Sequence, residues 1–482
     1  MAVPPERGVP SPPSQAREIP STSGLRRELG LWDLVLLNVV AIVGLRWWLT
    51  SAGGYGYAAL PLWILAFLCF FVPSGLAVID LSTRYPEEGG IYLWTKHAFG
   101  HDHGFIAGWC LWTNNLAYFP HLLIFTVGNL VFMLGSRYGY LERNKLLMGT
   151  ASLVLFWIAV WMNVRGLRYG RWLNNLGALG TWIPAGLLIL LGSWALLRYG
   201  PATPFEARGL IPVFNLGTVS FFSLICFGFS GLDLGPLMGS EIIDPRKNVP
   251  RAIIMSGAII TLIYVLGTAA LLVALPQNQI GILSGVGGAI AAVQEKMGFG
   301  FLAGISALFI ALGGIGGVSA WLAGSSRVPY VAGIDRYLPE SFGKVHPRYA
   351  TPHVALLLTG SISSLLILGG FIGSSVQETY EQLALFTTVV YFIPYLYLFA
   401  AIIKLGVPGT ATPGVISVPG GRIGAILVGA LGFLTTSIAI VFALIPPEDV
   451  LHPVWYETKI LGGFVILLGT GWLLYRRGRR EA

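Results

Sequence analysis

Charged side chains are scarce in this 482-residue chain: Asp, Glu, Lys and Arg make up 11% of it, whereas a soluble domain carries about 25%. Cysteine is rare as well. The three cysteines, Cys69, Cys110 and Cys226, lie within apolar stretches, so we expect packing residues and neither disulfides nor a metal site. Residues 1–24 lack an apolar segment ahead of a cleavage site, which excludes a signal peptide and predicts a disordered, Pro- and Ser-rich cytoplasmic tail.

Apolar sequence is abundant instead. Hydrophobic residues form 55% of the chain and its mean hydropathy is +0.72. Runs of about 20 apolar residues, the length that crosses a bilayer, occur twelve times. They lie near residues 31–50, 61–82, 105–135, 146–164, 172–197, 217–239, 251–275, 299–323, 353–373, 380–404, 420–445 and 453–475. We therefore predict an all-α polytopic membrane protein with twelve transmembrane helices in a domain of residues 25–475, followed by a short basic tail at 476–482.

The distribution of Lys and Arg predicts the orientation. With an even number of spans both termini lie on one side of the membrane, and that side holds 22 of the 30 basic residues. The positive-inside rule then makes both termini cytoplasmic in a multi-pass protein of the cell membrane. The net charge of +8 follows from this topology, so no nucleic-acid partner is expected.

Two apolar runs are interrupted at their centres by glycine and a charge. The first reads Val43-Gly44-Leu45-Arg46-Trp47, and the second reads "GFSGLD" from Gly228 to Asp233. A charge at bilayer depth is costly and normally faces a cavity, while an unwound helix frees backbone groups for a ligand. The predicted substrate-binding residues are Val43, Gly44, Leu45, Arg46, Phe229, Ser230, Gly231 and Asp233.

Three further stretches resemble the amino acid–polyamine–organocation (APC) transporters. They are "YPEEGGIYLWTKHAFG" (85–100), "GSEIIDPRKNVPRAI" (239–253) and "SSRVPYVAGIDRYLPESFGKVHPRYATP" (325–352). Within that superfamily, "AIVGLRWWLTSAGGYG" (41–56) is most similar to the glutamate/GABA antiporter branch. The resemblance begins near Leu29 and implies a leucine-transporter-like fold. In that fold, inverted five-helix repeats at about 29–198 and 212–405 contain the broken helices 1 and 6, and two extra helices follow at about 420–475.

Arg46 departs from the family pattern. Most relatives carry Gly-Ser/Thr-Gly in the unwound part of helix 1, whereas this chain has Gly44-Leu45-Arg46. An arginine there could bind a substrate carboxylate through paired hydrogen bonds. Two alternatives stay open at this point: Arg46 pairs with Asp233, or it lines a hydrated vestibule.

Four other residues are candidates for the pathway or its gates: Trp47, His121, Glu241 and Ser319. His121 could sense pH or simply pack within its helix. Glu241 could close an inner gate with Arg246, Lys247 or Arg327. Ser319 is the single hydroxyl in residues 313–319, and sodium sites of this fold usually need adjacent hydroxyls there, so sodium coupling is disfavoured. No cofactor or metal is expected.

These residues predict a transporter and not an enzyme. We expect exchange of amino acids, among them glutamate or related acidic substrates, by alternating access. The alternative is a proton-coupled symporter of amino acids or polyamines. Two other classes are less favoured: a transporter-like sensor, and an intramembrane serine hydrolase that would use Ser230 with His121 as base. The expected partners are the amino acid substrate and the lipid bilayer, and the oligomeric state is left open.

Overall fold

The computed structural model describes residues 27–213, 219–281, 285–297, 301–335, 337–370, 375–406, 414–445 and 453–481. The predicted N-terminal tail at 1–24 lies outside them. Every regular element of the described ranges is a helix. One isolated parallel bridge joins Leu29 to Ile242 and ties the start of the described chain to the end of the second interrupted run.

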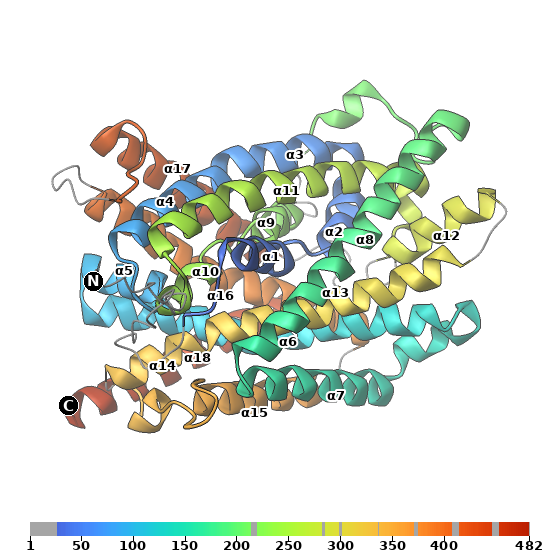
Figure 1. Cartoon of the computed structure of the whole chain (residues 1–482). Coiled ribbons are helices and arrows are strands. Elements are labelled where there is room, and N and C mark those ends of the chain that lie inside the picture. The colour runs from blue at the N-terminus through green and yellow to red at the C-terminus, as the bar shows by residue number, and fades with distance from the viewer. Residues whose placement is uncertain are drawn as a thin grey trace, which may run out of the picture.

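The helices form one elongated bundle (Figure 1). Its helices include α1 (Leu31–Ile42), α2 (Arg46–Tyr55), α3 (Ala59–Ala66), α4 (Val72–Arg84), α6 (His101–Met133), α7 (Lys145–Val164), α8 (Leu167–Tyr199), α9 (Val219–Gly228), α10 (Leu234–Leu237), α11 (Pro245–Ala274), α13 (Leu302–Ser325), α15 (His353–Gly370), α16 (Val376–Leu405), α17 (Gly421–Leu444) and α18 (Pro453–Glu481). Eight helical stretches of the described residues are long and apolar enough to cross a membrane. The protein is therefore a multi-pass, all-helical membrane protein.

Each of the apolar runs predicted from the sequence overlaps one or two of these helices. The count of twelve spans and the inverted repeat stay predictions. Three short helices were not predicted: α5 (Ile91–Phe99), α12 (Gly285–Met297) and α14 (Arg327–Ile334). Residues 476–481, expected to form a tail, continue α18 as helix.

The core of the bundle surrounds α1. Figure 1 shows α1 near the centre, with α3, α4 and α11 on one side of it and α13, α6 and α7 on the other. All residues of α1 from Leu37 to Ile42 are buried. A mostly apolar helix suits this central position, and the one polar side chain of the stretch, Asn38, donates its amide N–H to the hydroxyl of Ser256 at 3.1 Å.

Glycines allow α8 and α13 to pack backbone against backbone beside α1. A Cβ atom added at Gly177 would lie 2.6 Å from the Cα of Gly316, and one added at Gly180 would lie 2.4 Å from the backbone nitrogen of Gly313. Small residues at a helix–helix contact are the usual way to gain packing energy in a bilayer, where lipid tails remove the hydrophobic drive between helices. This close packing fixes one wall around the interruption in the first run.

Candidate functional site

Both predicted interruptions are breaks in a helix. The first break separates α1 from α2: Val43, the residue after α1, has an extended backbone with φ −69° and ψ 98°. The second separates α9 from α10, and within it Gly231 has φ +124°, a conformation that side-chain-bearing residues rarely adopt. Ending a helix frees backbone N–H and C=O groups that need partners at this depth.

Tyr264 of α11 supplies partners at both breaks. Its phenol oxygen lies 2.6 Å from the carbonyl oxygen of Ile42 and 2.8 Å from that of Gly228, and it also accepts a hydrogen bond from the N–H of Gly44 at 3.3 Å. The side chain is fully buried. One hydroxyl thereby joins the ends of the two broken helices.

Two further aromatic side chains satisfy freed backbone groups. The indole N–H of Trp321, in α13, donates to the carbonyl oxygen of Ala41 at 3.0 Å. The N–H of Gly231 donates to the phenol oxygen of Tyr395, in α16, at 2.8 Å. Side chains of three other helices, α11, α13 and α16, therefore stabilise the broken backbone by hydrogen bonding to its freed N–H and C=O groups.

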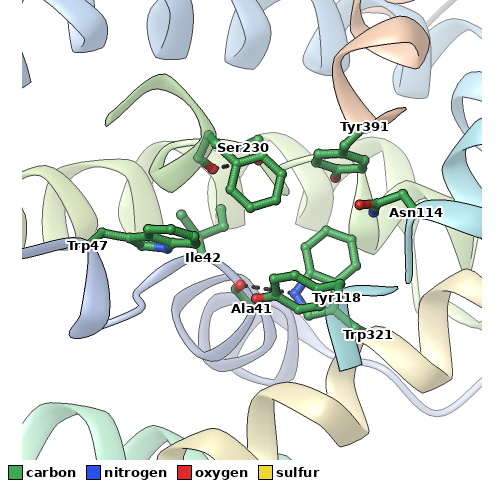
Figure 2. Close-up of a pocket in the computed structure, with 9 residues that line it drawn as sticks. Ala41, Ile42, Trp47, Asn114, Tyr118, Ser230, Trp321 and Tyr391 are labelled. Atoms are coloured by element: carbon green, nitrogen blue, oxygen red, sulfur yellow. Dashed lines mark hydrogen bonds between the residues drawn. The ribbon is translucent and has the colours of Figure 1, made fainter. Parts of the chain in front are cut away.

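A small cavity lies between the breaks. It is lined by Ala41, Ile42, Trp47, Asn114, Tyr118, Phe227, Ser230, Trp321 and Tyr391. Figure 2 shows these side chains converging from five different parts of the chain. A second, larger cavity shares Ala41 and Tyr118 with the first and is bordered by Gly44 and Arg46. Concave spaces with a few convergent polar groups are the usual form of a small-molecule site.

Arg46 is buried beside both cavities, with 3% of its surface exposed. Its Nη2 donates to the phenol oxygen of Tyr118 at 2.6 Å, and its guanidinium carbon lies 4.3 Å from the ring centroid of Trp47. Its Nε is buried and has no hydrogen-bond partner. The described residues thus give Arg46 neutral partners only, and none of them supplies a carboxylate for an ion pair.

Asp233 is completely buried in the second break. Its Oδ1 accepts hydrogen bonds from Tyr391 at 2.8 Å and from Tyr395 at 2.7 Å, whereas its Oδ2 has no partner. No ion pair joins Asp233 to Arg46 in the described part of the chain, so the pairing alternative was wrong. The physical reason is that each charge has its own tyrosine partners: Arg46 bonds a tyrosine of α6, and Asp233 bonds two tyrosines of α16.

The other predicted substrate-binding residues divide into two groups. Ser230 lines the smaller cavity, and Val43, Gly44 and Leu45 border the larger one. Phe229 and Gly231 lie in neither lining, and nor does Asp233. The ring of Phe229 packs edge-on against Trp63 and Tyr264. The sequence placed Phe229 in the site because it could not show which way each side chain of the break points.

The hydrolase alternative fails on geometry. The hydroxyl of Ser230 donates to the carbonyl oxygen of Phe227 at 2.6 Å. His121 is fully buried, places its Nδ1 3.1 Å from the carbonyl oxygen of Tyr380 and stacks on Trp47, with 5.8 Å between ring centroids. Among the described hydrogen bonds, none joins Ser230 to His121, as a nucleophile and its base would require.

Three pathway candidates have clear positions. Trp47 lines the smaller cavity. The hydroxyl of Ser319 is fully buried and accepts a hydrogen bond from the amide of Asn163 at 2.9 Å. Glu241 lies away from both cavity linings and accepts two hydrogen bonds from Arg327, at 2.7 and 3.0 Å, which selects one of its three predicted partners.

Sequence reasoning missed several residues, most of them aromatic, that surround the two breaks. The residues it did not single out are Asn114, Tyr118, Tyr264, Trp321, Tyr391 and Tyr395. A tyrosine inside a long apolar run was an available signal, because a buried hydroxyl needs a hydrogen-bond partner. The sequence could not say which partner each hydroxyl would find.

Comparison with known proteins agrees with this architecture. A model of the family described as "Amino acid permease" matches residues 29–468. An uncharacterized transporter of Legionella pneumophila is 30% identical over 94% of this chain and 97% of its own length. A probable agmatine/putrescine antiporter of Lactococcus lactis is 24% identical over 92% of this chain and 93% of its own length. A glutamate/gamma-aminobutyrate antiporter of the same species is 24% identical over 86% and 83%.

An all-helical membrane bundle with two broken helices around a buried cavity defines a small-molecule transporter. The chain belongs to the amino acid permease family of the APC superfamily, which confirms the resemblance of its loop motifs. Its family and relatives are transporters and not enzymes.

Proposed function

We propose that this permease exchanges amino acids across the membrane by alternating access, and that Arg46 binds a carboxylate of the substrate. The observation that carries this proposal is the charge of Arg46. A buried cation with one hydrogen bond to a neutral hydroxyl and a free Nε lacks a counter-charge. A substrate carboxylate would supply that charge and accept hydrogen bonds from the guanidinium.

Exchange is favoured over sodium-driven uptake by the surroundings of the one candidate hydroxyl in α13. Ser319, the one hydroxyl in residues 313–319, is already occupied by the amide of Asn163. The similarity to two proteins named as antiporters points the same way. Glutamate and related acidic amino acids are the first substrates to test, because a second carboxylate is compatible with a cationic site.

The test is uptake of labelled amino acids into liposomes that contain the purified protein. Uptake should be strongly accelerated when the liposomes are preloaded with unlabelled amino acid and should not depend on a sodium gradient. Equal uptake with and without internal substrate, combined with dependence on sodium, would refute exchange.

The role of Arg46 is tested by Arg46→Gln and Arg46→Lys. Both should lower the affinity for the substrate, and lysine should recover less than full affinity because it cannot bind a carboxylate through two parallel N–H groups. Arg208→Gln is the matched control, since Arg208 is exposed in the short helix η4 (Ala207–Leu210). Unchanged affinity in Arg46→Gln would exclude carboxylate binding by this residue.

A polyamine substrate is the second candidate, and the unpartnered Oδ2 of Asp233 favours it. Aromatic rings of Trp47, Phe227 and Tyr391 line the smaller cavity, and aromatic faces attract cations. Tyr391 connects this cavity to Asp233, because its hydroxyl donates to Oδ1 of that residue at 2.8 Å. Putrescine has no carboxylate, so its uptake should be lost in Asp233→Asn and kept in Arg46→Gln. The opposite pattern with an amino acid substrate supports the first candidate.

A further inference from the structure

A second charged cluster lies at the end of the bundle that the Lys and Arg distribution predicts to be cytoplasmic. It is built by Glu88, between α4 and α5, by Ser240 and Glu241 in the turn η5 (Gly239–Glu241), and by Arg327 at the start of α14. Figure 1 shows α4, α5, α10 and α14 at the same end of the bundle, where the N- and C-termini also lie. None of these four residues lines either cavity between the breaks.

Arg327 forms a bidentate ion pair with Glu241. Its Nε and Nη2 donate to the two carboxylate oxygens of Glu241 at 2.7 and 3.0 Å, and its Nη1 donates to the carbonyl oxygen of Ala323 and to the hydroxyl of Ser326. Arg327 is 2% exposed and Glu241 1%. One positive and one negative charge therefore cancel here.

Glu88 is a second carboxylate beside a guanidinium whose charge Glu241 already neutralises. Its Oε2 accepts hydrogen bonds from the N–H of Ser240 at 3.0 Å and from the hydroxyl of the same residue. Its Oε1 is buried, lies 3.9 Å from the Nε of Arg327 and has no hydrogen-bond partner. With 7% of Glu88 exposed, an ionised carboxylate would add an uncompensated negative charge. Tyr330 of α14 also faces the cluster and contributes a neutral phenol.

We propose that Glu88 is a proton-binding site, which holds a proton on Oε1 while this end of the transporter is closed and releases it to water when the end opens. Two buried carboxylates that share one guanidinium favour such a proton, because it removes the excess negative charge. Burial and the neighbouring Glu241 carboxylate raise the pKa of Glu88 from 4.5 to about 8, against the opposing effect of Arg327 and Ser240.

The proposal rests on the alternating access of the proposed function for its second half. Access from this end requires that the segments carrying Glu88, Glu241 and Arg327 separate, and water then solvates both carboxylates. The pKa of Glu88 falls toward the value of an exposed glutamate, and its proton leaves to the same side. No proton crosses the membrane, so the site makes opening sensitive to pH without driving transport. Acid should favour the closed state.

The proton itself is tested by the melting temperature of the purified protein in detergent from pH 5 to 9, which needs no substrate. A raised pKa in the folded state means that folding holds a proton which the unfolded chain loses above about 4.5. Wild-type stability should therefore fall as pH rises through this window and level off above about 8. Glu88→Gln should lack this decline, and Glu87→Gln, at an exposed neighbour, should retain it. Parallel wild-type and Glu88→Gln profiles would overturn the proposal.

Ser240→Ala provides a second variant in case Glu88→Gln does not fold. This change removes the hydroxyl that donates to Oε2 of Glu88 and so destabilises the ionised carboxylate. In Ser240→Ala the fall in melting temperature should therefore extend to higher pH than in the wild type. A decline at unchanged pH in Ser240→Ala would place the titrating group elsewhere.

The link to opening is tested by exchange in liposomes with equal pH on both sides. The equilibrium constant for opening should rise by up to about tenfold per pH unit between the two pKa values of Glu88. The wild-type rate should rise with it, whereas Glu88→Gln should stay at the low rate of acidic pH. His121→Gln, which removes the buried histidine, should keep the pH dependence.

The two measurements can fail separately. If the melting profiles agree with a proton on Glu88 while exchange in Glu88→Gln still depends on pH, the link to opening is refuted and the proton site stands. If no substrate is exchanged, the proposed function fails and the melting test still decides the proton site.

Discussion

The phenol oxygen of Tyr264 lies 2.8 Å from the carbonyl oxygen of Gly228, although the two residues belong to different helices. The same oxygen lies 2.6 Å from the carbonyl oxygen of Ile42, where the other broken helix ends. A movement that separates the two breaks must therefore break or exchange a hydrogen bond of this hydroxyl. Tyr264 is in a position to couple the two halves of the site.

Replacing Tyr264 by Phe should cost about 1–3 kcal/mol of stability, because a freed and buried carbonyl loses its donor. The melting temperature in detergent measures this loss. Exchange should slow as well, since the two breaks are no longer tied together. Tyr140→Phe is the control, because Tyr140 is 66% exposed and its hydroxyl is not part of the site. Equal melting temperatures for both variants would show that the Tyr264 hydroxyl does not contribute to the stability of the protein.

Arg46 and Asp233 should behave as independent charges. Because each has its own tyrosine partners, Arg46→Gln and Asp233→Asn should lower stability additively, with a coupling energy below about 0.5 kcal/mol. In contrast, Asp233→Asn and Tyr391→Phe should couple by about 0.5–3 kcal/mol, since these two side chains share a hydrogen bond. Double-mutant cycles of thermal unfolding measure both numbers. Strong coupling between Arg46 and Asp233 would contradict the separate arrangement.

The cluster of Arg327 should rank its substitutions by the charge that each leaves behind. Arg327→Met leaves the buried Glu241 carboxylate without its cation and should cost the most, about 3–5 kcal/mol. Glu241→Gln should cost less, because without the Glu241 charge the pKa of Glu88 falls, and the ionised Glu88 then serves as counter-charge 3.9 Å from the guanidinium. Melting temperatures at pH 7 give the order. A larger loss in Glu241→Gln than in Arg327→Met would mean that Glu88 does not share the charge.

Gly177→Ala should weaken the packing of α8 against α13. Its new Cβ would lie 2.6 Å from the Cα of Gly316, so one backbone must move, at a cost of about 1–3 kcal/mol. Gly186→Ala in the same helix is the matched control, because nothing lies within 4 Å of its added Cβ. We expect that control to be neutral or slightly stabilising, as alanine favours helix over glycine. Thermal unfolding of both variants in detergent provides the comparison.

Composition and local pattern determined much of this protein. Long apolar runs specify helices that cross a membrane, because a bilayer leaves backbone groups no partner outside the helix. Glycines beside a charge within such a run marked both breaks, at Gly44 with Arg46 and at Gly231 with Asp233. These signals are local in the chain, so they can be read without knowing which helices become neighbours.

The partners of those charges were decided by the tertiary structure alone. Arg46 contacts Tyr118, which is 72 positions away, and Asp233 contacts Tyr391, which is 158 positions away. A pair between the two charges was a reasonable prediction from the sequence because opposite charges attract. In the structure, each charge instead forms hydrogen bonds with tyrosine hydroxyls of neighbouring helices. Glu88 was overlooked for the same reason: only the approach of three separate segments buries it beside Glu241 and Arg327. Which groups share a low-dielectric interior depends on distances between helices, and a linear pattern does not contain them.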